Sequence, residues 1–327
     1  MNNALFTLAG WHAYTLSRQA EHSLCCRSDM NGALIMNRPV ILCGGGDARY
    51  IFACRELCSF AKVYSYGLDG ALGETIALNS LDDMRQKADI LLLPMLAGIG
   101  LDIPCACAES LSCDKLSGHL EKNALVLGGR LSTDVIEYFS SLGFDVMDYF
   151  TREELVIKNC VPTAEGALEI VLRELAVTVN GTKTLIIGYG RVAKACAKLF
   201  DAVGSDVTVC ARKLSQLAMA ENDGCRALFL GRLADEAGDF DIVINTVPAL
   251  VLTKQVLERL KKDCLIIDLA SKPGGTDFEA AKLLGRKAIH ALALPGKTAP
   301  ASAGKIIAEA VRNIYNERRE TDVFRGH

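Results

Sequence analysis

Two glycines, Gly188 and Gly190, mark the stretch of this chain that is best suited to bind a ligand. They follow a short apolar run at residues 184–187 and precede a helical pattern rich in small residues. A strand, Gly-x-Gly-x-x-Ala and a helix in that order are typical of a turn that binds the pyrophosphate of a dinucleotide. Such a helix begins with unpaired N–H groups, here around Arg191 and Val192, and these favour negative charge. We therefore predict a dinucleotide site at this turn.

The end of the next strand, residues 206–210, distinguishes NAD from NADP. An NAD site usually carries Asp or Glu there, to bind the ribose 2′-hydroxyl. This chain instead continues with Ala211, Arg212, Lys213 and, two residues further on, Ser215. Cationic and hydroxyl side chains suit a 2′-phosphate, although a solvated basic turn would have the same composition. The prediction is NADP as cofactor.

A third loop of the same half follows another buried apolar strand, and it is expected beside the nicotinamide end of the cofactor. Ligands of parallel sheets bind beyond the carboxyl ends of the strands. The loop consists of Asn245, Thr246, Val247 and Pro248. We add these four residues to the predicted cofactor site.

The first half of the chain has a second glycine-rich loop, which follows the strand at residues 39–43. Gly45, Asp47 and Arg49 lie in it. Arg49 stands where a Rossmann turn needs a small residue, so we expect this loop to hold substrate rather than a second nucleotide. Asp47 is a candidate general base, and it could equally cap the following helix.

A long amphipathic helix is expected from Asn159 to about residue 179, crossing from the first domain to the second. Asn159, Thr163 and Glu165 would then lie at an interdomain cleft, with Glu165 as a second candidate base. Pro162 followed by an acidic residue is also an ordinary signal for the start of a helix. The two interpretations are compatible.

Two histidines lie inside the expected fold. His119 is a third candidate base, although a surface position on a helix would explain it as well. His290 lies within an apolar strand, so we expect it in the core. Cys105, Cys107 and Cys113 precede His119 with spacings that are not common for zinc. We predict no metal site.

Strands that alternate with helical stretches predict an α/β fold with two doubly wound parallel sheets, the second a Rossmann dinucleotide-binding domain, joined by interdomain helices. The expected order is a flexible leader at residues 1–35, a substrate domain of Rossmann-like or flavodoxin-like type at 36–160, the NADP-binding domain at 161–300, and a C-terminal segment at 301–327. That last segment should form a helix to about residue 317, pack back on the first domain and end in a frayed tail.

Composition limits the classes of function. The 327 residues fit two domains, and the net charge of −3 without an extended basic block argues against nucleic acid as a partner. We find no apolar run of membrane-spanning length. Thirteen cysteines scattered through apolar segments fit buried thiols in a reducing cytoplasm.

Several phrases, taken together, resemble the A subunits of bacterial dipicolinate synthase. They are Gly45-Gly-Asp-Ala-Arg49, Pro162-Thr-Ala-Glu-Gly166, Gly188-Tyr-Gly-Arg191, Asn245-Thr-Val-Pro248, Asp268-Leu-Ala-Ser-Lys-Pro-Gly-Gly-Thr-Asp-Phe278 and Leu294-Pro-Gly-Lys-Thr-Ala-Pro300. The resemblance implies an NADP-linked oxidation that forms dipicolinate (pyridine-2,6-dicarboxylate) from a dihydro- or hydroxytetrahydro-dipicolinate. This reaction branches from the lysine and diaminopimelate pathway in the mother cell of a sporulating bacterium. The resemblance also implies a partner, the flavoprotein-like B subunit of dipicolinate synthase.

Such a reaction needs cations or N–H groups that hold the two carboxylates of the substrate. Candidates are Arg49, Lys272, Lys297 and the amides of Gly274 and Gly275. Lys272 stands where the family is expected to have arginine, which keeps the charge and loses the bidentate fork.

Two other function classes stay open. Another NADP-dependent dehydrogenase, of the 2-hydroxyacid or shikimate type, would have the same architecture. A non-catalytic NADP-binding regulatory subunit would need only the nucleotide turn. A homo-oligomer is compatible with any of these functions.

Overall fold

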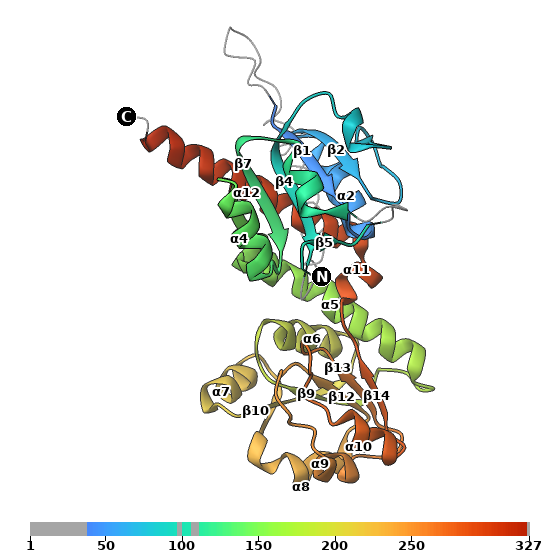
Figure 1. Cartoon of the computed structure of the whole chain (residues 1–327). Coiled ribbons are helices and arrows are strands. Elements are labelled where there is room, and N and C mark those ends of the chain that lie inside the picture. The colour runs from blue at the N-terminus through green and yellow to red at the C-terminus, as the bar shows by residue number, and fades with distance from the viewer. Residues whose placement is uncertain (1–37, 97–99, 106–110, 326–327) are drawn as a thin grey trace, which may run out of the picture. The chain divides into compact units, whose positions relative to one another are not determined.

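The computed structural model describes residues 38–96, 100–105 and 111–325, with the last four of these described in backbone only. The predicted leader at residues 1–35 and Cys107 lie outside this part of the chain. Two six-stranded parallel sheets organise the described residues (Figure 1).

The first sheet has the order β3-β2-β1-β4-β7-β8, and all its pairings are parallel. Its strands are β1 (Val40–Gly44), β2 (Lys62–Tyr66), β3 (Ile76–Ala77), β4 (Ala88–Met95), β7 (Leu120–Gly129) and β8 (Asp145–Asp148). Its helices are α2 (Ala48–Leu57), α3 (Cys113–Ser117) and α4 (Thr133–Ser141), and a small hairpin pairs β5 (Asp102–Ile103) with β6 (Leu111–Ser112).

Both faces of this sheet are covered, as the near-continuous apolar strands require. Alternate residues of β1 enter different cores, because successive side chains point to opposite faces. Ile41 and Cys43 pack in a cluster with residues of α2 and of the C-terminal helix α12 (Pro300–Arg325), whereas Val40 and Leu42 pack with residues of α3 and α4.

The second sheet repeats this plan in the order β11-β10-β9-β12-β13-β14, which is the strand order of a dinucleotide-binding fold. Its strands are β9 (Lys183–Ile187), β10 (Asp206–Ala211), β11 (Arg226–Phe229), β12 (Ile242–Asn245), β13 (Leu265–Asp268) and β14 (Lys287–His290). Its helices are α6 (Arg191–Ala202), α7 (Leu214–Asn222), α8 (Leu233–Glu236), α9 (Lys254–Arg259) and α10 (Phe278–Leu283). Single 3₁₀ turns lie at Leu81–Asp83, Tyr149–Thr151, Leu230–Arg232 and Ala237–Asp239. The predicted fold class is confirmed.

Helix α5 (Glu153–Glu174) begins earlier than predicted. Pro162 lies inside it, nine residues after its first residue, so the interpretation of Pro162 as a helix start is wrong. The start is set instead by Arg152, whose extended backbone caps the helix, and by two acidic residues in the first turn. The helix ends at Glu174 rather than near residue 179, and it runs through residue 160, where the sequence suggested a domain boundary.

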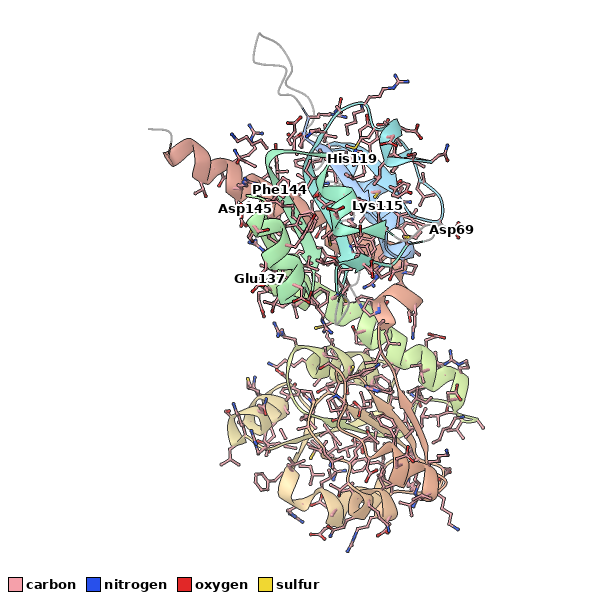
Figure 2. The ribbon with its side chains drawn as sticks, in the orientation of Figure 1. Asp69, Lys115, His119, Glu137, Phe144 and Asp145 are labelled. Carbon is pink, nitrogen blue, oxygen red and sulfur yellow. The ribbon has the colours of Figure 1, made fainter. Side chains whose placement is uncertain are left out.

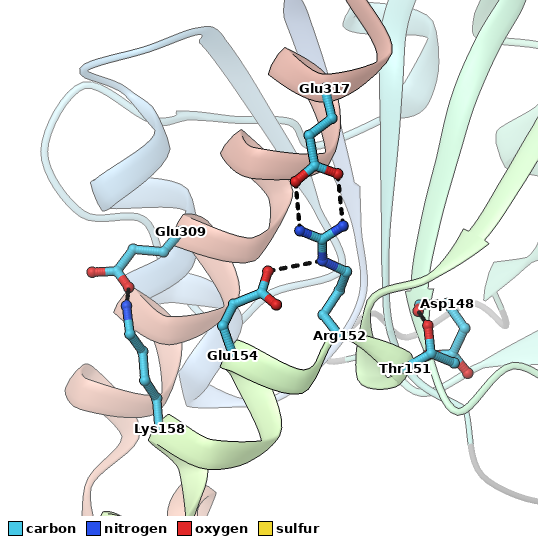
Figure 3. Close-up of polar contacts among 7 residues, drawn as sticks. All are labelled: Asp148, Thr151, Arg152, Glu154, Lys158, Glu309 and Glu317. Atoms are coloured by element: carbon cyan, nitrogen blue, oxygen red, sulfur yellow. Dashed lines mark hydrogen bonds and ion pairs between the residues drawn. The ribbon is translucent and has the colours of Figure 1, made fainter. Parts of the chain in front are cut away.

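The chain ends with α11 (Leu294–Thr298) and α12. Helix α12 contacts both α2 and α5, and it stays helical to Arg325. The helix therefore extends eight residues beyond the end predicted near residue 317. Figure 3 shows one reason: Arg152 donates two hydrogen bonds, of 2.7 and 2.6 Å, to the carboxylate of Glu317, and Lys158 pairs with Glu309.

Candidate functional site

The glycine turn after β9 has the geometry expected of a dinucleotide site. Gly188 has a φ of 92°, which favours glycine. A Cβ built on it would lie 2.6 Å from Oγ1 of Thr246 and 2.9 Å from Cγ2 of Val247. The structure thus brings the turn and the predicted loop after β12 into contact, with no room for a side chain at Gly188.

Gly190 is the N-cap of α6, and no atom crowds the position that a side chain would occupy. It is exposed, and a Cβ on it would meet nothing within 4 Å. No side chain caps the helix, so its first N–H groups are available to an anion. Ala193 is fully buried, as the predicted packing of helix on strand requires. Arg191 is exposed and pairs with Glu153 of α5, while Val192 is half-buried beside it.

The basic turn after β10 is free to meet a ligand. Ala211, the last residue of β10, is buried, whereas Arg212, Lys213 and Ser215 are not. None of these three side chains has a polar partner among the described residues. Because β10 pairs with β9 in parallel, this turn lies at the same sheet edge as the glycine turn.

The side chain of Asn245, predicted to lie at the cofactor site, bonds to its own loop and to Asp268. Its side chain is fully buried and donates to the carbonyl oxygen of Val247 (3.0 Å) and to Oδ1 of Asp268 (2.9 Å), while its Oδ1 accepts from the N–H of Val247 (3.1 Å). Asn245 therefore shapes the loop. Pro248 is exposed at the end of this loop.

Asp268, to which the sequence analysis gave no role, organises the loop that follows β13. It is completely buried at the carboxyl end of β13, and all its hydrogen-bond donors are neutral groups. Its Oδ1 accepts from Asn245 and from the N–H of Ala270 (3.0 Å). Its Oδ2 accepts from the N–H of Gly275 (2.8 Å) and the hydroxyl of Thr276 (2.7 Å). An aspartate that ends an apolar strand was the available signal.

This arrangement corrects the role predicted for Gly274 and Gly275. The N–H of Gly274 donates to the carbonyl oxygen of Ser271 (2.9 Å), and that of Gly275 donates to Asp268. Neither amide is left for a substrate carboxylate, because the loop folds back on its own strand. Lys272 is exposed and has no polar partner in the described part of the chain.

In the domain of the first sheet, Arg49 and Asp47 form an ion pair just after the end of β1. The Arg49 side chain is only 9% exposed, and its Nε and Nη2 donate to the Asp47 carboxylate at 2.6 to 3.1 Å. Asp47 also accepts from the N–H of Arg49 (3.0 Å) and so caps α2, the alternative role noted from its sequence. Gly45, which precedes the pair, donates its N–H to the carbonyl oxygen of Tyr66 and closes the turn.

The charge of this pair argues against Asp47 as a general base. Partial burial alone would raise the pKa of Asp47, but the hydrogen bonds and the charge of Arg49 outweigh burial and leave the pKa below its ordinary value. A carboxylate that holds its proton so weakly removes protons poorly. Asp47 instead fixes the guanidinium of Arg49, whose Nη1 makes no hydrogen bond within the described chain.

The surroundings of Arg49 come from distant parts of the sequence. A Cβ on Gly296 of α11 would lie 2.8 Å from its Nε, so the absence of a side chain there makes room for the guanidinium. Nearby, the hydroxyls of Tyr50 and Tyr149 hydrogen-bond at 2.7 Å, and complete burial raises the pKa of both. Lys297 follows Gly296 and is exposed.

Helix α5 carries three residues that were predicted to act together, but it does not present them on one face. Asn159 and Thr163 are one turn apart, and the Thr163 hydroxyl donates to the Asn159 carbonyl oxygen (2.8 Å). Glu165 is two residues beyond Thr163, about 200° around the helix, and it is exposed. Glu165 therefore cannot share a site with the other two side chains on this helix face.

His119 lies at the wrong edge of the first sheet for a catalytic role beside Arg49. His119, labelled in Figure 2, immediately precedes β7. Its carbonyl oxygen accepts from the N–H of Ala88, the first residue of β4. Both strands therefore begin there, whereas Asp47 and Arg49 follow the end of β1. Strand β7 is ten residues long, so roughly 30 Å separate its two ends. The prediction of His119 as a base at this site is wrong.

His290 is only half-buried rather than a core residue. Its Nε2 is 2.9 Å from the carbonyl oxygen of Ala270, and its ring stacks on Phe278. No group of three or more potential metal ligands occurs in the described part of the chain, and none of the helices described is long and apolar enough to cross a membrane.

Known proteins resemble this chain at two levels. Residues 164–284 match the family model of the D-isomer specific 2-hydroxyacid dehydrogenase NAD-binding domain. The A subunit of dipicolinate synthase from Bacillus subtilis (strain 168) is 30% identical over 280 residues, which cover 84% of this chain and 94% of that protein.

Solved structures agree. The crystal structure of the dipicolinate synthase A subunit from Bacillus halodurans matches with a TM-score of 0.78 and 30% identity, covering 86% of this chain and 99% of that one. The corresponding Bacillus subtilis structure gives a TM-score of 0.77 and 29% identity, over 88% and 98%. These matches support an oxidoreductase with a nicotinamide dinucleotide cofactor and a small-molecule substrate. The chain belongs to the family of dipicolinate synthase A subunits.

Proposed function

We propose that this protein oxidises a dihydrodipicolinate to dipicolinate with NADP, as the dehydrogenase subunit of a dipicolinate synthase; a hydroxytetrahydro-dipicolinate as substrate would in addition lose one water. Family membership supports the reaction class. The observation that carries the substrate class is Arg49, a buried arginine at the carboxyl edge of a parallel sheet with one guanidinium nitrogen uncommitted within the described chain. Arginine is suited to a planar carboxylate.

Two cationic side chains hold the substrate in this proposal. Arg49 binds one carboxylate of the substrate while Asp47 holds the other edge of the guanidinium. Lys297, next to the glycine that makes room for Arg49, binds the second carboxylate. A dinucleotide held at the glycine turn after β9 would supply the acceptor for the hydride that leaves the substrate ring. The accompanying proton passes to water, because Asp47 is a weak base and Glu165 and His119 lie elsewhere.

The choice of NADP rests on the basic turn after β10. Arg212, Lys213 and Ser215 are accessible and uncommitted within the described residues, and Ala211 provides no carboxylate that would bind a 2′-hydroxyl and repel a phosphate. The pyrophosphate would meet the N–H groups after Gly190. In this proposal Arg191 keeps Glu153 as its partner and only borders the phosphates.

The family also suggests the setting. We propose that the partner is a flavoprotein-like B subunit. For the location we propose the cytoplasm of the mother cell of a sporulating bacterium. Both statements rest on kinship with the A subunits of dipicolinate synthase.

The test is a coupled absorbance assay. Purified protein, NADP and freshly generated pathway substrate are mixed, in the presence or absence of the B subunit, while NADPH and dipicolinate are followed together. Equal appearance of both products is expected. Cofactor binding without either product, when the partner is present, would refute the reaction and favour a regulatory role.

The Arg49→Lys variant tests the role of Arg49 in the same assay, because lysine keeps the positive charge but lacks the planar guanidinium that can bind two partners. It should raise KM for the substrate and leave NADP binding unchanged. Lys62→Arg is the control, because it keeps the charge and lies at the start of β2, at the sheet edge opposite the glycine-rich loop.

A further inference from the structure

Tyr189, the residue between the two glycines of the dinucleotide turn, has a side chain that no role described so far uses. It is 3% exposed and packs in the cluster that contains Ala193 of α6, Val209 of β10 and Ala220 of α7. The side chain of a residue within the nucleotide turn therefore reaches the helix that follows the basic turn.

A hydrogen bond completes this connection. The Tyr189 hydroxyl donates to Oδ2 of Asp223 at 2.6 Å, and Asp223 is the C-cap of α7. A bond to a carboxylate is shorter and stronger than one between neutral groups. Burial raises the pKa of Tyr189, and the bond to Asp223 raises it further, so the hydroxyl remains a donor at neutral pH. The ammonium of Lys194 covers the ring at 5.2 Å from its centroid.

Helix α7 depends on this contact more than a longer helix would. It has nine residues, and only Leu217 and Ala220 among them are buried. Its N-cap is Lys213, without a side-chain hydrogen bond to the cap. The basic turn thus lies at one end of a lightly packed helix, and Asp223 lies at the other end, about 15 Å from Lys213.

We propose that the Tyr189–Asp223 hydrogen bond is a latch that positions α7, and with it Arg212, Lys213 and Ser215, relative to the phosphate-binding turn. The latch thereby sets the preference for a 2′-phosphorylated dinucleotide. Tyr189 is a positioning residue, since its own side chain is buried in the core. The inference rests on the proposed use of NADP and adds the device that enforces it.

The test compares NADPH and NADH binding to the parent, Tyr189→Phe, Asp223→Asn and the double variant, by titration of nicotinamide fluorescence. Loss of one hydrogen bond should weaken NADPH binding about 3- to 10-fold and NADH binding less than about 2-fold. The double variant should match Tyr189→Phe, because that substitution already removes the hydrogen bond that Asp223→Asn only weakens by removing the charge of the acceptor. Tyr138→Phe, which removes a 3.1 Å tyrosine–aspartate bond in the first sheet's domain, is the matched control.

Hydrogen exchange of the ligand-free protein provides a second readout. Amides of α7 should exchange faster in Tyr189→Phe than in the parent, and those of α6 should not. Suppose that the parent prefers NADPH, but the Tyr189 and Asp223 variants either lose affinity for NADPH and NADH equally or lose none. This result would overturn the latch and leave the assignment of NADP intact. A parent without any preference would refute NADP itself, and with it the role of the latch in setting that preference.

Discussion

The close packing of α12 on α2 gives the sharpest prediction, at Gly304. A Cβ on this residue would lie 2.4 Å from the carbonyl oxygen of Arg49, 2.7 Å from Cβ of Phe52 and 2.9 Å from the N–H nitrogen of Ala53. All three atoms belong to backbone or to a Cβ, so no side-chain rotation relieves the overlap. Gly304→Ala therefore has to push the two helices apart.

The magnitude follows from two opposing effects. Overpacking a well-packed site costs about 1–3 kcal/mol. Alanine gains roughly 0.5–1 kcal/mol over glycine in a helix. The variant should therefore lose about 0.5–2 kcal/mol of unfolding free energy, which lowers Tm by a few degrees. Because Arg49 is the residue displaced, KM for the substrate should rise as well.

The assay is thermal unfolding followed by circular dichroism, in parallel with the steady-state kinetics. Gly118→Ala is the control, because Gly118 has helical backbone angles and a Cβ there would meet nothing within 4 Å. It should change Tm little. A Gly304→Ala protein as stable as its parent would refute the packing argument.

Three further predictions concern charged groups. Arg49→Lys should lower kcat/KM at least about 10-fold in the coupled assay, because lysine cannot bind a carboxylate and Asp47 through one planar fork; unchanged kinetics would contradict the proposed role. Asp268→Asn should cost about 2–4 kcal/mol in urea unfolding, since two of the four buried donors then face an NH₂ group; a loss near zero would contradict it. The hydrogen bonds from Arg152 hold the pKa of Glu317 below its ordinary value of 4.5, so the pair stabilises the fold above about pH 4.5 and loses this effect as pH falls through the folded-state pKa. Glu317→Gln should therefore be less stable than the parent at neutral pH and equal to it in strong acid, and Glu258→Gln, which breaks an exposed pair on α9, should show no such trend.

The sequence was sufficient for the two sheets and the nucleotide turn, because the signals are local. Strands buried on both faces appear as short apolar runs, and Gly188 and Gly190 follow one of them directly. The start of α5 was missed because Pro162 gives the stronger local signal, while Glu153 and Glu154 begin the helix without a side-chain cap. Local rules cannot rank two competing helix starts that lie nine residues apart.

The errors at the site have a different cause, which is contact between residues distant in sequence. Nothing near Gly275 shows that its N–H is already taken by Asp268, seven residues earlier. Nothing near Asp47 shows that its carboxylate holds an arginine rather than a substrate proton, because the burial of Arg49 depends on Gly296 and Gly304 at the far end of the sequence. The residue types at the site were predictable, and their partners were not.

The C-terminal helix α12 also stabilises the first sheet. The cluster on one face of this sheet contains Ile41 of β1 and Leu57 of α2, but also Ile307, Val311 and Ile314 of α12. These three side chains are almost completely buried, and each contributes about 1.5–3 kcal/mol of burial. A fragment that ended after the second sheet would expose this face together with Arg49. The loop that carries Asp47 and Arg49 therefore depends on the last helix of the chain for its burial, which ties the proposed substrate site to the integrity of the C-terminus.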